Sequence, residues 1–326
     1  MFQLRFDLRV PGFAETTHAQ QYKAALDMVS WADTRGFSGI VVSEHHGLED
    51  GYLSSPVTLA SAMLALTSKL TCSISALLVP YHDPLRLAED IACVDLISGG
   101  NRIICIVGLG YRPEEFAMFG RDRTRRGLLA EEGVAAMLLA WTGEPFEYQG
   151  RTVRVTPKPL TQPHPFVMMG GSAEISARRA ARLGLGFMPP VGDKELAKIY
   201  YAEAERLGFE QPFALLPRGP GMVLVSEDPD RTWSQIGPNC LYDAQSYASW
   251  QSPDQRSSWH VEADDLDALR ASGQYRVVTP DQCVELASEF PSVVVHPLVG
   301  GIDPRIGWEC LELVASKVIP RLNPQT

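Results

Sequence analysis

A glutamate and two histidines stand together at Glu44-His45-His46. An imidazole has an ordinary pKa of about 6.5, so a histidine can give or take a proton near neutral pH. The triplet lies where an apolar, strand-like run ends, and adjacent strand residues point to opposite faces, so the two rings need a backbone turn to face one side. We expect one of these histidines to act as a general acid or base, or else to be a structural histidine.

The histidines do not favour a metal site. The seven of them are scattered along the chain, and none is spaced as His-x-His, at His18, His45, His46, His82, His164, His260 and His296. We therefore expect no bound metal.

Two glycine-containing segments also follow apolar runs. Met168-Met169-Gly170-Gly171-Ser172 leads into a predicted helix, where free N–H groups and the positive end of the helix dipole favour a phosphate, although a glycine pair before a helix is also common punctuation. Gly108-Leu109-Gly110-Tyr111 marks either a close approach of a ligand or a tight turn. It lacks the third glycine of a dinucleotide-binding fingerprint.

These residues meet only if several strands end side by side. Strand-like runs alternate with amphipathic, helix-like runs, which is typical of repeated βα units. The pattern predicts strands at 2–10, 39–44, 71–79, 102–108, 165–170, 185–188, 221–226 and 292–298, with helices at 17–35, from 56, at 84–98, 125–141, 174–184, 194–207 and 306–319.

Eight strand–helix units favour an α/β fold, a (β/α)₈ TIM-type barrel over residues 1–326, rather than a doubly wound sheet. In such a barrel the carboxyl ends of the strands carry the active site. The first strand alternates polar with apolar residues, and we expect its polar side chains to point into the barrel near a ligand: Gln3, Arg5, Asp7 and Arg9.

The connection between the seventh and eighth strands is longer than one helix needs. We interpret 227–279 as an insertion that forms a lid over the site. Its aromatic residues either line a pocket or pack the insertion on the barrel, and they are Trp233, Tyr242, Tyr247, Trp250 and Trp259.

The composition is that of a globular protein, with 45% hydrophobic and 21% charged residues and a formal net charge of -10. This acidic balance disfavours a nucleic-acid partner, since such partners are bound by clustered cations. The six cysteines form no Cys-x-x-Cys pair, and no run of about 20 apolar residues occurs. We expect reduced cysteines, no membrane partner and a cytoplasmic location.

Several motifs, in this order and spacing, resemble the luciferase-like monooxygenase family from the first strand to the last helix. They are Ser43-Glu44-His45-His46, Ser55-Pro56, Leu77-Leu78-Val79-Pro80, Pro84-Leu85-Arg86-Leu87-Ala88-Glu89-Asp90, Asp95, Gly99-Gly100, Gly108-Leu109-Gly110-Tyr111, Pro113-Glu114-Glu115-Phe116, Phe119-Gly120, Gly170-Gly171-Ser172 and Leu183-Gly184.

The resemblance implies a flavin above the carboxyl ends of the strands. His45 is similar to the catalytic histidine of luciferase, and Glu44 would orient it through a hydrogen bond. The segment Ser75-Ala76-Leu77 matches the family's non-prolyl cis peptide, at Ser75-Ala76, under the flavin ring. The strand-four exit at Gly108, and Gly170, Gly171 and Ser172, look like further cofactor contacts, the last two to the phosphate.

One position departs from luciferase. Leu109 stands where luciferase has a phosphate-binding arginine, so Arg112 or the main chain would take its place. The resemblance therefore leaves three hypotheses open. The first is a monooxygenase that uses reduced FMN from a flavin reductase, and O₂, on a small organic substrate. The others are an F420-dependent oxidoreductase and a non-catalytic flavin-binding protein. Family habit suggests a homodimer.

Overall fold

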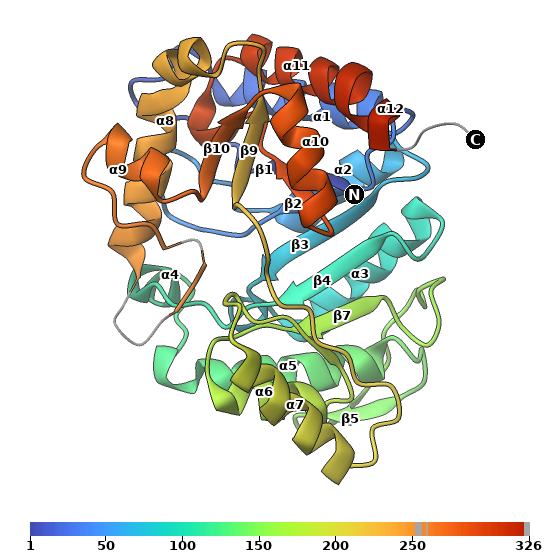
Figure 1. The fold of residues 1–326 in the computed structure, drawn as a ribbon. Helices are drawn as coiled ribbons and strands as arrows, with labels where there is room; N and C mark the ends of the chain where they lie inside the picture. Colours follow the sequence, from blue (N-terminus) through green and yellow to red (C-terminus); the bar gives the residue numbers. More distant parts are fainter. Residues whose placement is uncertain (252–255, 259, 323–326) are drawn as a thin grey trace.

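A parallel sheet forms the centre of the computed structural model (Figure 1). The structure describes residues 1–251, 256–258 and 260–322. Its strands follow the order β10-β9-β11-β1-β2-β3-β4-β7-β8, with β1 at Phe2–Phe6, β2 Gly39–Val42, β3 Thr71–Leu77, β4 Ile103–Val107, β7 Phe166–Met169, β8 Gly186–Phe187, β9 Met222–Val225, β10 Tyr275–Val278 and β11 Val293–Val295. Within the described ranges no recorded pairing joins β10 to β8. Since the strands are parallel, their carboxyl ends share one edge.

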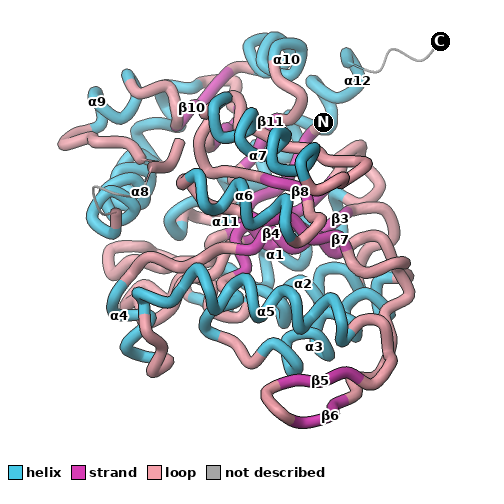
Figure 2. The backbone as a smooth tube through the Cα atoms, turned by 90° about the horizontal axis from the view of Figure 1, so that it is seen from below, coloured by secondary structure: helices cyan, strands magenta, loops and turns pink. Residues whose placement is uncertain are grey.

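Helices pack around this sheet. They are α1 His18–Ala32, α2 Pro56–Ala65, α3 Pro84–Ser98, α4 Pro113–Met118, α5 Arg126–Ala140, α6 Glu174–Arg182, α7 Lys194–Arg206, α8 Pro229–Trp250, α9 Leu266–Ala271, α10 Pro280–Glu289, α11 Pro304–Leu313 and α12 Ile319–Leu322. Figure 2 shows α2, α3 and α5 side by side, with the hairpin β5 Phe146–Tyr148 and β6 Arg151–Val153 at the rim.

Local sequence explains where most of these helices begin. Side chains of Thr17, Asp83 and Asp193 accept hydrogen bonds from first-turn N–H groups of α1, α3 and α7. Proline occupies the first turn of α2, α3, α4, α8, α10 and α11, where its missing N–H is not needed. The strands are rich in β-branched and aliphatic residues, and they pack against the helices in one large core.

The first strand is shorter than the predicted 2–10. It ends at Phe6, because Leu8 adopts a left-handed backbone with a φ of 55° and the N–H of Arg9 turns back to the Asp7 carboxylate. Arg5, Asp7 and Arg9 are nevertheless buried, as expected of polar side chains that point inward, whereas Gln3 is only half-buried.

The segment 227–279 is more regular than the sequence suggested. It contains the 22-residue helix α8, the short helix α9 and the strand β10, which pairs with β9 in the main sheet. The helix starts at Asp228-Pro229, whose carboxylate accepts from the Arg231 N–H. Trp259 lies outside the described residues.

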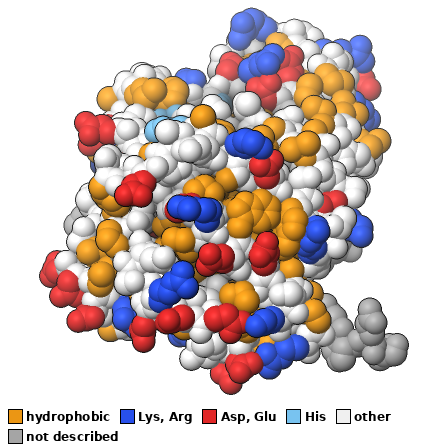
Figure 3. All heavy atoms as spheres, turned by 90° about the horizontal axis from the view of Figure 1, so that it is seen from above, with side chains coloured by type: hydrophobic (Ala, Val, Ile, Leu, Met, Phe, Trp, Pro, Cys, Tyr) orange, Lys and Arg blue, Asp and Glu red, His pale blue; other side chains and the backbone are white. Residues whose placement is uncertain are grey.

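In the described part of the chain, no helix combines the length and the apolar composition needed to cross a membrane. On the face shown in Figure 3, acidic and basic side chains are interspersed with apolar ones. The polar residues described next lie at one edge of the parallel sheet.

Candidate active site

The Glu44-His45-His46 triplet follows the end of β2 after one intervening residue, at the carboxyl edge of the sheet. All three side chains are buried, with 2%, 6% and 7% of their surface exposed. Just before them, Ser43 Oγ donates a hydrogen bond of 2.7 Å to the Ser75 carbonyl oxygen at the end of β3. The ends of β2 and β3 are thereby joined beside the histidines.

His45 is held by Glu115, a residue of α4. Its Nδ1 atom lies 3.0 Å from Glu115 Oε1, which also accepts from the His46 N–H at 3.0 Å and from Arg112 Nη1 at 3.2 Å. Tyr81, in the short 3₁₀ turn Val79–Tyr81, donates its hydroxyl to Glu115 Oε2 at 3.0 Å. The carboxylate of Glu115 therefore has donors on both oxygens.

These donors set the ionisation of Glu115 and the tautomer of His45. Burial raises the pKa of the Glu115 carboxyl, but the hydrogen bond and charge of His45, the His46 N–H and the charge of Arg112 outweigh burial and hold that pKa below its ordinary value. An ionised carboxylate can only accept hydrogen bonds, so Nδ1 of His45 carries the proton. In the neutral ring, Nε2 is then left with a lone pair.

Burial is the main reason why the pKa of His45 lies below 6.5, with Glu115 opposing this shift and Arg112 and Arg9 adding to it. The ring is therefore neutral at pH 7. His45 is suited to accept a proton at Nε2, which lies 3.5 Å from the Tyr111 hydroxyl.

We had expected Glu44 to orient His45, but its carboxylate bonds to other residues. Its Oε1 lies 2.9 Å from His46 Nε2 and 2.7 Å from His82 Nε2, and its Oε2 accepts the Leu78 N–H at 2.6 Å. The side chains of the adjacent residues Glu44 and His45 point in different directions. Glu44 therefore bonds to His46 and His82 rather than to His45.

The hydrogen bonds around Glu44 also shift ionisation. Burial raises the pKa of the Glu44 carboxyl, but the hydrogen bonds from His46 and His82 dominate and lower it to about 2. Burial lowers the pKa of His82, but its bond to Glu44 outweighs burial and raises that pKa above the ordinary value. Glu44 is thus a structural anion joining the ends of β2 and β3.

Aromatic side chains surround the His45 ring. Tyr52 and Trp250 lie closest, each with its ring centroid 4.9 Å from that of His45, and Tyr111 and Tyr247 follow at 5.7 Å and 6.0 Å. Tyr247 and Trp250 belong to the last turns of α8. Of the described aromatic residues in 227–279, these two have rings against His45, whereas Trp233 lines a separate groove with Arg270 and Tyr275.

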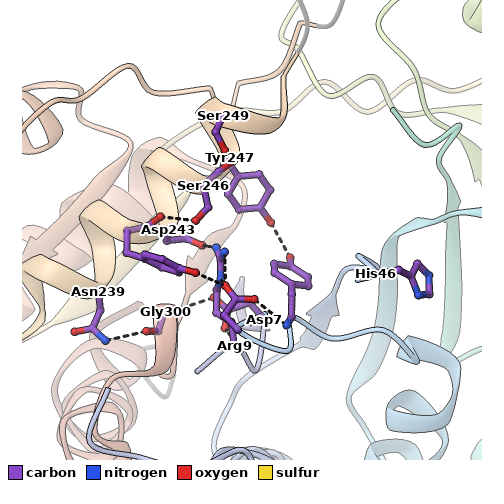
Figure 4. Close-up of polar contacts among 12 residues, drawn as sticks. Asp7, Arg9, His46, Asn239, Asp243, Ser246, Tyr247, Ser249 and Gly300 are labelled. Carbon is purple, nitrogen blue, oxygen red and sulfur yellow. Dashed lines mark hydrogen bonds and ion pairs between the residues drawn. The ribbon is translucent and has the colours of Figure 1, made fainter. Parts of the chain in front are cut away.

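A buried polar network fastens α8 to the end of β1 (Figure 4). Arg9 pairs with Asp50 and with Asp243 of α8, both at 2.6 Å, and Tyr275 donates its hydroxyl to Asp243. Tyr247 accepts from Arg5 at 3.1 Å, and its hydroxyl lies 2.7 Å from that of Tyr52. Figure 4 shows His46 apart from this network.

The predicted cofactor contacts of β3 and β4 lie together. The Ser75-Ala76 peptide bond is cis, as the resemblance implies. Ser75 and Ala76 are half-buried, whereas Leu77 is fully buried in the core. A Cβ on Gly108 would lie 2.6 Å from Ala76 Cβ, so glycine is required where β3 and β4 end.

The turn before α6 provides a second group of contacts. A Cβ on Gly171 would lie 2.3 Å from Ser176 Oγ, and it would be 4.0 Å from Leu109. The N-cap residue of α6, Ala173, offers no side-chain hydrogen bond to the first turn. Among the described residues, the buried Ser176 Oγ and Arg179 Nη1 have no hydrogen-bond partner.

Arg112 does not lie in this turn. It is buried, donates to the His46 carbonyl at 2.9 Å as well as to Glu115, and its guanidinium lies 5.2 Å from the Trp250 ring centroid. These contacts hold the Arg112 guanidinium beside His45, and they give no support to the expected replacement of the missing arginine by Arg112.

Sequence reasoning missed Glu115 as the partner of His45, although Pro113-Glu114-Glu115-Phe116 had been noticed as a motif. It also left open the choice among the aromatics of α8. In the ranges the structure describes, no group of three or more His, Cys, Asp or Glu residues is arranged to hold a metal ion.

A buried histidine–carboxylate pair at the carboxyl edge of a parallel sheet, beside a glycine turn, defines the class of site. The family model for luciferase-like monooxygenases matches residues 6–296, and the chain belongs to this family.

The chain is similar to one curated relative and to two solved structures, among others. The FMNH₂-dependent dimethylsulfone monooxygenase of Pseudomonas putida is 32% identical over 135 residues, which are 39% of this chain and 37% of that enzyme. The monooxygenase RslO1 from Streptomyces bottropensis shares 24% identity with a TM-score of 0.77, covering 98% of this chain and 99% of RslO1. An F420-dependent secondary alcohol dehydrogenase shares 15% identity with a TM-score of 0.68, covering 96% and 97%. The two structural likenesses establish the fold alone.

Proposed function

We propose that this chain is a monooxygenase that uses reduced FMN and O₂ to oxygenate a small organic substrate, with the flavin supplied by a separate reductase. The observation that carries the proposal is the neutral His45, held through Nδ1 by Glu115 beside the ends of β3 and β4. The name of the Pseudomonas putida relative supports the choice of reduced FMN.

The residues present fit a flavin. Half-buried Ser75 and Ala76, with Gly108 beside them, are small residues on which the ring would lie. Gly171, Ser172 and the unpartnered Ser176 hydroxyl would hold the phosphate at the N-terminus of α6, where the helix dipole favours an anion. When bound, reduced FMN supplies the electrons for activating O₂.

The protein's own groups would handle the proton and exclude water. His45 Nε2 accepts a proton from the substrate side of the site, while Glu115 holds the ring and stabilises its protonated form. Tyr111 stays protonated, since burial raises the pKa of its hydroxyl, and this hydroxyl, 3.5 Å from His45 Nε2, would donate to an oxygen atom of the substrate. Trp250 and Tyr247 form an aromatic wall that keeps water from His45.

Three further features belong to the same proposal. The sheet closes into a (β/α)₈ barrel, segment 227–279 covers the site, and the protein forms a homodimer. The contacts of α8 with His45 support the covering role. Leu66 of the α2 end and Leu96 and Ile97 of α3 are exposed apolar side chains on neighbouring helices, and they support the dimer. Light scattering that shows a monomer at micromolar concentration would contradict the dimer.

An anaerobic titration with reduced FMN and, in parallel, reduced F420, followed by admission of O₂, tests the cofactor. Tighter binding of reduced FMN and an oxygen-dependent transient in the flavin spectrum are expected. Preference for F420 without such a transient would instead support the second candidate, hydride transfer. This candidate is favoured by the presence of Leu109 where luciferase has an arginine. If FMN binds but no candidate substrate accelerates decay of the transient, the chain is a flavin-binding protein without turnover.

A further inference from the structure

An arginine from the segment after α8 reaches the turn before α6. Nη2 of Arg256 donates to the Ser172 carbonyl oxygen at 3.2 Å and lies 2.9 Å from Asp193 Oδ2. Asp193 is the N-cap residue of α7, so Arg256 bridges the starts of two helices. Its side chain is 54% exposed, which leaves part of its surface accessible to a ligand.

This turn has the geometry of an anion site but little positive charge. Gly171 has a φ of 119°, and the buried Ser176 hydroxyl beside it has no partner among the described residues. Leu109 contributes no charge there. Arg179 lies further along the same helix and is buried, with its Nε bonded to Glu131 and its Nη1 without a partner among the described residues.

A phosphate monoester carries between one and two negative charges near neutral pH, with a second pKa of about 6. The N-terminus of a helix supplies only about half a unit of positive charge. Two carboxylates also lie near this turn. Asp193 pairs with Arg256, and Glu174, in the first turn of α6, pairs loosely with Arg178 at 3.9 Å. A further cation at this turn would therefore strengthen the binding of a phosphate.

We propose that Arg256 binds the phosphate of FMN, in the role that an arginine at position 109 would fill, and so selects FMN over unphosphorylated flavin. The inference rests on the proposed function. It assigns to segment 227–279 a contact with the cofactor in addition to the wall that α8 forms beside His45. Arg256 would keep its position next to Ser172 and exchange part of its pairing with Asp193 for the phosphate.

The test compares the affinities of the full-length protein for oxidised FMN and for riboflavin, measured by quenching of flavin fluorescence. Riboflavin has the same ring and lacks the phosphate. R256A should weaken FMN binding about 10- to 100-fold, the usual range for a hydrogen bond to a charged group. Riboflavin affinity should stay within about twofold, and R256K should recover part of the lost affinity for FMN.

Arg154 offers a matched control. It is also exposed, at 57%, and it bonds one carbonyl oxygen, that of Gly143, and lies near one carboxylate, that of Glu144. R154A should leave both affinities unchanged. Equal losses for FMN and riboflavin in R256A would show that Arg256 only holds its loop, and an unchanged preference would also overturn the inference. If the wild-type protein binds neither flavin, the proposed function fails as well.

Discussion

His45 Nδ1 and Glu115 Oε1 are 3.0 Å apart, although 70 positions separate the two residues in the sequence. The pair exists because β2 and β4 both end at the carboxyl edge of the sheet and α4 follows the β4 exit. It assigns the proton to Nδ1 and leaves a lone pair on Nε2.

Replacing His45 by Asn removes the proposed base while preserving a polar side chain of similar size. Oxygenation should fall about 10²- to 10⁴-fold, the usual contribution of general acid–base catalysis, while FMN affinity remains within about threefold. Steady-state assays and flavin titration measure the two effects separately. Loss of flavin binding together with activity would show that His45 is mainly structural.

Glu115→Gln should loosen the position of the His45 ring and lower the pKa of that ring. The amide must turn an NH₂ group toward one of the present donors, so the ring is held less firmly and kcat should fall. Glu115 opposes the lowering of the His45 pKa, so its removal should lower that pKa further and move the acidic limb of the kcat profile to lower pH. A loss of activity without any shift of the limb would argue against this positioning role. E114Q, at an exposed neighbouring carboxylate, is the control.

The same reasoning predicts the pH dependence of the wild-type enzyme. His45 must be neutral to accept a proton, and its folded-state pKa lies below 6.5 because of burial. Activity should therefore be level through pH 7 and decline only on acidification below about 6.5. Folding stability should also fall in that direction, because the unfolded chain takes up the proton more readily. A decline beginning above pH 7 would contradict the neutral, buried ring.

Glu44→Gln should destabilise the fold. The carboxylate accepts from His46, His82 and the Leu78 N–H, and an amide cannot accept at both ends, so we expect a loss of about 3 kcal/mol. Because the Glu44 pKa is lowered to about 2, its ionic contribution is present above its ordinary value of 4.5 and is lost as the pH falls through 2. The difference from wild type in urea unfolding should therefore shrink below pH 4.5.

Glu49 is exposed and five residues away, so E49Q should change the free energy of unfolding by less than about 0.5 kcal/mol. An E44Q protein as stable as E49Q would show that the cluster around Glu44 contributes little.

Asp243→Asn tests the attachment of α8. It removes one of two carboxylates paired with the buried Arg9, and we expect a cost of about 3 to 5 kcal/mol, as for other broken buried ion pairs. Asp230, on the same helix, is 86% exposed and pairs with Arg270, so D230N should cost less than about 1 kcal/mol. Equal unfolding midpoints in guanidinium would refute the anchoring role of Asp243.

The sequence was sufficient to predict most elements, because caps, prolines and apolar runs are local signals. It also placed His45 at a strand end and Arg5, Asp7 and Arg9 in the interior. It was insufficient for contacts that depend on register across strands. Glu44 seemed the natural partner of His45 because of adjacency, whereas the spatial partner, Glu115, comes from another unit.

The sequence reading of 227–279 missed two local signals that were present. Asp228-Pro229 caps and opens α8, and Thr279-Pro280 with Gln282 forms a capping box at the start of α10, just after β10. Arg256 had no such signal, since nothing local shows that a loop arginine meets Ser172. Its role depends on how the segment folds back on the sheet.

The pairing of Arg9 with Asp243 also bears on the order in which the molecule can be completed. Strand β1 lies between β2 and β11, so β1 gains its second neighbour only when residue 295 has been made. Until Asp243 of α8 has been made, Arg9 lacks one of its two carboxylate partners. A nascent chain that ends before Asp243 therefore leaves one edge of β1 open and Arg9 incompletely paired, and the contacts of α8 with His45 cannot yet form.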